Sequence, residues 1–125
     1  MPRIILQIVF ATLLCVGALM PRAAVACEFG YCWGAVAFGP LGTAGYATRL
    51  STAPDAENRA RAACGEDCMA VEVFNDACAA LAVDREDAYQ VGFGGTRTDA
   101  ETAARENCEA MELYCVVRVS ACSHK

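Results

Sequence analysis

The chain has 125 residues, of which 56% are hydrophobic and 20% charged, and its formal net charge is −5 at pH 7. This length encodes one small domain, whose core is modest and whose stability gains from cross-links. The acidic balance and the lack of a basic cluster exclude nucleic acid and disfavour anionic membrane surfaces as partners.

Residues 1–26 have the order of parts of a secretory signal peptide. Arg3 precedes an apolar run over residues 4–20, and Ala24-Val25-Ala26 is a cleavage site of the A-x-A type. We therefore expect a single secreted or periplasmic domain over residues 27–125. Loss of Arg3 and Arg22 would give this domain a net charge of about −7.

Two alternatives for this segment stay open. A transmembrane anchor is less favoured, because the apolar run is at the short end of the spanning range and Pro21-Arg22 ends it. A lipid anchor on Cys27 is also less favoured, because Ala24 stands three positions before it, where a residue like leucine is usual.

The rest of the chain predicts a small α+β domain. In the first half we expect strands over residues 33–38, 44–51 and 69–74, a turn at 39–42 and a helix that starts near Asp55. In the second half we expect strands over residues 77–83, 88–94 and 115–122, a charged turn at 84–87 and a helix from Asp99. Each half has the order strand, strand, helix, strand.

Many residues recur at an offset of 44 positions. The recurring pairs include Thr52 and Thr96, Asp55 and Asp99, Glu57 and Glu101, Cys64 and Cys108, and Cys78 and Cys122. We interpret the domain as two tandem repeats, over about residues 33–76 and 77–123. The prediction is an antiparallel sheet packed by two short helices, with closure towards a barrel as an alternative.

The two helices have recognisable starts. Thr98 and Glu101 fit a capping box, so Thr98 is predicted to cap the second helix. In the first helix, Pro54 occupies the corresponding position, so Asp55 or Thr52 must cap instead.

Each helix also has a charged face and a small face. Ion pairs four residues apart are expected between Glu57 and Arg61 and between Glu101 and Arg105. The opposite faces consist of small residues that let a helix lie close to a sheet, namely Ala56, Ala60, Ala63 and Cys64 in the first helix and Ala100, Ala103, Ala104 and Cys108 in the second.

Several stretches together carry a family resemblance. They are WGAVAFGP, DAENRARAAC, CMAVEVFNDACAALAV, GFGGTRTDAETAARENC and CVVRVSAC. Over about residues 33–123 the chain resembles the domain-of-unknown-function family 4189. The resemblance implies a small exported bacterial protein with one domain and no established activity, and it transfers no catalytic residue. Cys27 and Cys32 lie outside the region of resemblance.

Eight cysteines remain after Cys15 is removed with the signal peptide. They are Cys27, Cys32, Cys64, Cys68, Cys78, Cys108, Cys115 and Cys122. An even number in a small exported domain predicts disulfides. A zinc site is less favoured, because the spacings fit poorly and the only histidine, His124, stands next to the C-terminus. We expect no metal and no cofactor.

The positions within the repeats favour particular pairs. Cys64–Cys68 and Cys108–Cys115 would each join a helix end to the following strand. Cys78 and Cys122, as equivalent positions in two copies, would meet across a pseudo-twofold axis. Cys27 and Cys32 are then left to pair with each other. Exchange between copies, such as Cys64 with Cys115, is the alternative.

Catalytic patterns are weak. His124 is expected to be mobile at the tail, which disfavours nucleophilic hydrolysis, and no G-x-S-x-G or phosphate-binding motif occurs. Asp76, Glu72, Asp84 and Asp87 are the carboxylates that could approach one another for acid–base work. Thiol–disulfide exchange is disfavoured because Cys64 and Cys108 stand at helix C-termini.

The sequence therefore favours a non-enzymatic exported protein that binds an unknown macromolecule in the envelope or in a host. A weak carboxylate hydrolase or a thiol–disulfide oxidoreductase is the alternative.

Overall fold

A computed structural model describes residue 27, residues 32–111 and residues 114–124 of the chain. The predicted signal peptide over residues 1–26 lies outside the described residues. In chain order the elements are β1 (Trp33–Phe38), a short 3-10 helix (Pro40–Gly42), β2 (Ala44–Leu50), α1 (Ala53–Cys64), β3 (Ala70–Asn75), β4 (Cys78–Val83), β5 (Tyr89–Gly94), α2 (Arg97–Glu109) and β6 (Val116–Cys122). The predicted α+β class and element order are confirmed.

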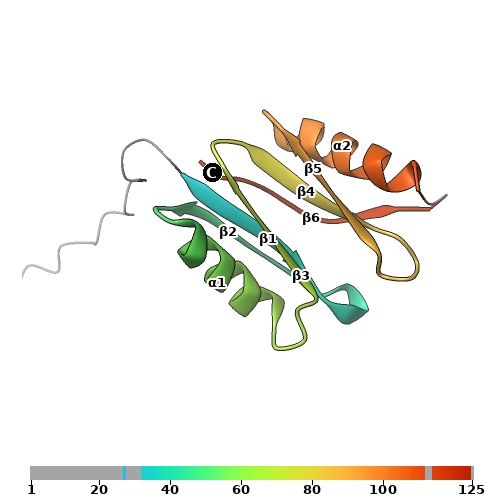
Figure 1. Cartoon of the computed structure of the whole chain (residues 1–125), viewed down its shortest axis with the longest axis horizontal. Helices are drawn as coiled ribbons and strands as arrows, with labels where there is room; N and C mark the ends of the chain where they lie inside the picture. The colour runs from blue at the N-terminus through green and yellow to red at the C-terminus, as the bar shows by residue number, and fades with distance from the viewer. Residues whose placement is uncertain (1–26, 28–31, 112–113, 125) are drawn as a thin grey trace, which may run out of the picture.

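The strands form two antiparallel three-stranded sheets with the orders β2-β1-β3 and β5-β4-β6. The first strand of each half is therefore central in its sheet, and the two strands that follow it pair on either side. The two helices lie on opposite sides of the molecule, with the sheets between them (Figure 1). The alternative of a closed barrel is wrong, because each sheet pairs within its own half and packs face to face on the other.

Residue size separates the packing layers. Larger buried side chains fill the space between the sheets, including Val36, Phe38, Phe74, Leu81 and Val83. Small residues fill the layers between each sheet and its helix, with Ala56, Ala60 and Cys64 buried on α1 and Ala100, Ala104 and Cys108 buried on α2. The predicted small helix faces are confirmed at these positions, whereas Ala63 is exposed.

Glycines on the strands allow this close packing. A Cβ atom at Gly92 would collide with the backbone of Ala100 and Ala104, and one at Gly45 would collide with the backbone of Ala60 and Cys64. Each helix thus rests directly on a strand of its own sheet.

Both helices are capped by threonines that stand 44 residues apart. The Thr52 hydroxyl accepts a hydrogen bond from the Asp55 N–H at 3.3 Å, and the Thr96 hydroxyl accepts one from the Asp99 N–H at 3.1 Å. The prediction that Thr98 caps α2 is wrong, because the helix begins at Arg97, two residues before the expected start at Asp99, and takes its cap from Thr96.

The two helices differ in their charged faces. On α1, Arg61 and Glu57 form the expected ion pair at 3.1 Å. On α2, Glu101 instead accepts a hydrogen bond from the Ser120 hydroxyl of β6. The predicted pair of Glu101 with Arg105 does not form, because β6 offers Glu101 a partner within the fold.

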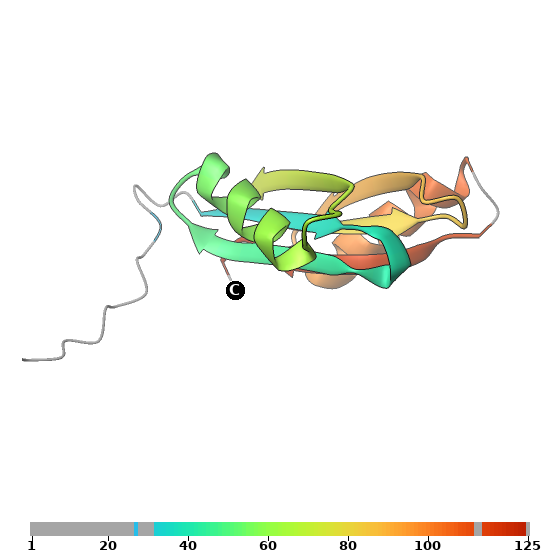
Figure 2. The same ribbon diagram turned by 90° about the horizontal axis from the view of Figure 1, so that it is seen from below.

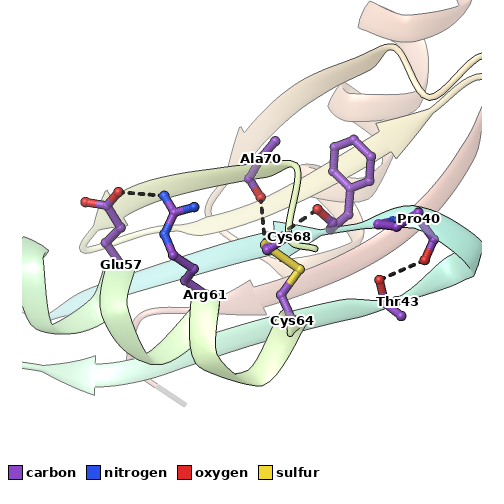
Figure 3. Close-up of a disulfide and its surroundings, with 8 residues drawn as sticks. Pro40, Thr43, Glu57, Arg61, Cys64, Cys68 and Ala70 are labelled. Carbon is purple, nitrogen blue, oxygen red and sulfur yellow. Dashed lines mark hydrogen bonds and ion pairs between the residues drawn. A yellow bond between two sulfur atoms is a disulfide. The ribbon is translucent and has the colours of Figure 1, made fainter. Parts of the chain in front are cut away.

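Four disulfides join Cys27 to Cys32, Cys64 to Cys68, Cys78 to Cys122 and Cys108 to Cys115. These are the pairs favoured from the sequence. Figure 3 shows Cys64–Cys68 closing the end of α1 onto the start of β3, where the Cys68 sulfur lies 3.6 Å from the Phe38 carbonyl oxygen.

The expected reason for the Cys78–Cys122 bond is wrong. Cys78 begins β4 and Cys122 ends β6, so both lie in the second half and face each other across neighbouring strands. Their Cα atoms are 3.9 Å apart. Strand register within one sheet, rather than a pseudo-twofold axis between copies, brings them together.

Candidate functional site

A cavity of about 320 Å³ lies at the end of the molecule where the β3–β4 turn, the start of α2 and the C-terminal residues meet. Its lining residues are Asp76, Ala77, Cys78, Gly95, Thr96, Arg97, Cys122 and His124. The Cys78–Cys122 disulfide therefore forms part of the wall, and Asp76, Arg97 and His124 supply the ionisable groups.

Asp76 organises one side of this cavity. Its backbone is in the left-handed region, with φ of 48°. Its Oδ1 atom accepts a hydrogen bond from the Cys32 N–H at 3.2 Å and lies 3.0 Å from Nε2 of His124. Its own N–H donates to the Cys32 carbonyl at 3.1 Å. Asp76 thus holds the start of β1 and the C-terminal histidine together.

The expectation that His124 is mobile is wrong, because its neighbour Ser123 is the anchor of the C-terminus. Ser123 is fully buried. Its hydroxyl accepts from the Ala77 N–H at 3.1 Å, and its N–H donates to the Ala77 carbonyl at 2.8 Å. Its carbonyl accepts from the Arg49 N–H at 2.8 Å, which joins the two sheets. No pattern in the sequence indicated this role of a single serine.

A second hollow, of about 460 Å³, follows the edges of β2 and β6. It is lined by Ala44, Gly45 and Tyr46 from β2, by Val117, Arg118, Val119 and Ser120 from β6, and by Arg97 and Glu101 from α2. We call it the β2–β6 groove. The two strands run along the same side of the molecule (Figure 2). Arg97 lines both the groove and the cavity, so the two hollows meet at this side chain.

Reasoning from the sequence did not single out two residues in this region, Arg118 in the groove and Leu41 in the turn before β2. Arg118 stands at an irregularity of β6, where the pairing with β4 shifts between Leu81 and Ala82. Leu41, in the turn before β2, is fully exposed and has φ of 59°. A bulky residue in the left-handed region is uncommon, and such positions concentrate at functional sites.

The four carboxylates considered for acid–base chemistry have different surroundings. Glu72 accepts a hydrogen bond from the Tyr89 hydroxyl at 3.3 Å, and Asp84 accepts from the N–H groups of Glu86 and Ala88 in its own turn. Asp76 contacts His124, as described above, and Asp87 is exposed with φ of 62°. Structural contacts therefore account for three of the four side chains.

The Tyr89–Glu72 contact also affects an ionisation. Partial burial, together with the charge of Glu72 and the hydrogen bond to it, raises the pKa of the Tyr89 hydroxyl above its usual value. The same ring packs edge-on against Phe38, with 5.3 Å between ring centroids. Tyr89 thus links the two sheets on the side opposite the groove.

All eight cysteines outside the expected signal peptide are oxidised in disulfides. In the described part of the chain, no three His, Cys, Asp or Glu side chains are grouped so that they could hold a metal ion. Nor is any helix of the described residues both long and apolar enough to cross a membrane.

These features define a disulfide-linked α+β domain with two stacked sheets, in which a cavity and a groove adjoin at Arg97. The family model described as Domain of unknown function (DUF4189) matches residues 33–122, and the chain belongs to this family. The resemblance noted from the sequence is thereby confirmed. Comparison with curated proteins and with solved structures returned no match.

Proposed function

We propose that this protein is an exported, non-enzymatic binding domain whose macromolecular partner contacts the surface around Arg97. The observation that carries the proposal is the convergence of the cavity and the β2–β6 groove on this one side chain. An arginine between two hollows offers five N–H donors and a permanent charge to a ligand.

Export is supported by the signal-like segment over residues 1–26 and by the disulfides, which persist in oxidising compartments. A binding role in the envelope or in a host is supported by Tyr46, an aromatic side chain that lines the groove and is 59% exposed.

Site-specific cross-linking tests the proposal. A photoreactive phenylalanine analogue replaces Tyr46 in one variant and Arg59, which is exposed on α1, in a control variant. We expect discrete adducts in envelope or host extracts from position 46 only, with competition by unlabelled protein and loss of the adducts on Arg97→Glu substitution. Adducts that form equally at both positions, or no adduct that unlabelled protein displaces, would overturn it.

Thiol–disulfide exchange is a second candidate, favoured by the position of the Cys78–Cys122 bond. This bond lines the cavity together with His124 and Arg97, and the positive charge of an arginine stabilises a leaving thiolate. Titration with a dithiol, followed by alkylation and peptide mapping, shows which disulfide opens first and so tests this candidate. Selective opening of this disulfide, slowed by His124→Gln, would support exchange, whereas opening after or together with the other bonds would remove the candidate.

A further inference from the structure

We propose that the β2–β6 groove binds an extended, acidic segment of a partner protein by β-strand addition. This inference rests on the proposed binding function and names the class of partner. It is carried by the edge strands, the charges and the exposed apolar side chains of the groove.

Both strands that line the groove are sheet edges. β2 pairs with β1, and β6 pairs with β4. In an antiparallel edge strand, alternate residues direct their N–H and C=O groups away from the sheet, where an added strand can pair with them. The bond from the Arg49 N–H to the Ser123 carbonyl already joins the two edges at one end. The groove occupies the part of this seam that lies between residues 44–46 and 117–120.

The charges of the groove favour an acidic partner. Arg97 and Arg118 bring two cations to it. Glu101 is the one carboxylate in the lining, and it accepts the hydrogen bond of Ser120. The groove is thus positive on a chain whose net charge is −5. Charge complementarity steers an acidic segment to it and opposes association with a second copy of this acidic chain.

Exposed apolar groups at the groove suit alternate side chains of an added strand. Tyr46 on β2 supplies an aromatic contact at the edge. The Arg118 guanidinium extends towards the turn before β2, where it lies near Gly42, the residue after the fully exposed Leu41. An extended segment can therefore place acidic residues by the two arginines and an apolar residue by Tyr46.

Titration of the disulfide-bonded, ¹⁵N-labelled protein with matched synthetic peptides tests the inference. The probe is the octapeptide Thr-Asp-Val-Asp-Val-Asp-Val-Thr, with a Lys-for-Asp version as the charge control and a version N-methylated at alternate amides as the backbone control. We expect amide shifts confined to residues 42–49 and 116–121. Replacing Asp by Lys, or methylating the amides, should weaken binding at least tenfold.

Charge-reversal variants test the residues. Arg118→Glu and Arg97→Glu should each lower the affinity for the acidic peptide about tenfold, equivalent to about 1.4 kcal/mol. Arg59→Glu on α1 should leave it unchanged. Arg118→Gln removes the charge without reversing it and should lower the affinity by a smaller factor. Circular dichroism of each variant checks that a loss of affinity does not come from misfolding.

The outcomes separate this inference from the proposed function. Equal binding of the acidic and Lys peptides, shifts elsewhere on the protein, or no binding of the acidic peptide would overturn strand addition. If the cross-linking at position 46 still succeeds, the binding function stands and only this mode of recognition fails. If both experiments fail, both proposals fall.

Discussion

The two halves of the molecule build the same order of elements, but they hold the ends of their central strands differently. In the second half, Cys78 at the start of β4 is bonded to Cys122 at the end of β6. In the first half, Trp33 and Asn75 face each other at the corresponding strand ends without a covalent bond. There the neighbouring Cys32 N–H donates a hydrogen bond to the Asp76 carboxylate, and the Asp76 N–H donates one to the Cys32 carbonyl.

The same order of elements can therefore form with or without a disulfide between these strand ends. The features that both halves share belong to the helices. They are the threonine caps at Thr52 and Thr96, the cysteines at the helix ends, Cys64 and Cys108, and the small faces that pack on the sheets. The strand ends are free to differ, and the covalently closed end of the second half forms a wall of the cavity.

The largest expected effect comes from removing the covalent bond that only one half has. The double variant Cys78→Ala/Cys122→Ala should lower the free energy of unfolding by about 4 kcal/mol, because the bond closes a loop across 44 residues. Cys64→Ala/Cys68→Ala, which opens a short loop in the first half, should cost about 2 kcal/mol. Denaturant unfolding measures both, and equal losses would contradict the comparison.

A close helix–strand contact gives the next effect. Gly92→Ala should cost about 3 kcal/mol, because the new Cβ atom meets the backbone of α2. Gly45→Ala should have a similar cost in the first half. Gly95→Ala is the control, since its Cβ would have no neighbour within 4 Å. Thermal unfolding of the three variants gives the measurement, and a stable Gly92→Ala protein would show that the helix can move away.

Loss of a helix cap should lower the free energy of unfolding by a smaller amount, which is similar in both halves. Thr52→Ala and Thr96→Ala should each cost about 1 kcal/mol, because one N–H at the helix start loses its acceptor. Thr98→Ala should be nearly neutral. The same unfolding measurement applies, and a larger loss at position 98 than at position 96 would reverse the assignment of the cap.

The smallest effect concerns the Tyr89–Glu72 contact between the sheets. Tyr89 has a pKa that is raised in the folded state, so the folded chain holds this proton more tightly than the unfolded chain does. Its contribution to stability is present below about pH 10, the unperturbed pKa of tyrosine, and is lost as the pH rises through the raised value. Tyr89→Phe should reduce this alkaline loss. Unfolding between pH 8 and 11 checks it, and identical pH profiles would reject the contact.

Most of the fold could be predicted because it depends on local patterns. Alternation of apolar residues gave the strands to within one residue or two, and alanines and cysteines at helical spacing gave the buried helix faces. The site could not be predicted in the same way. The four carboxylates selected by residue type have different surroundings, whereas Arg97, Arg118 and Leu41 are ordinary surface residues in the sequence.

Periodicity and turn residues were enough to predict the class of the fold and the order of the elements, because both follow from patterns along the chain. Tertiary contacts were needed for the two stacked sheets, for the β4–β6 register behind the Cys78–Cys122 bond, for the contact between Asp76 and His124, and for the position of Arg97 between a cavity and a groove. Such features depend on contacts between residues far apart in the chain, which no local pattern encodes.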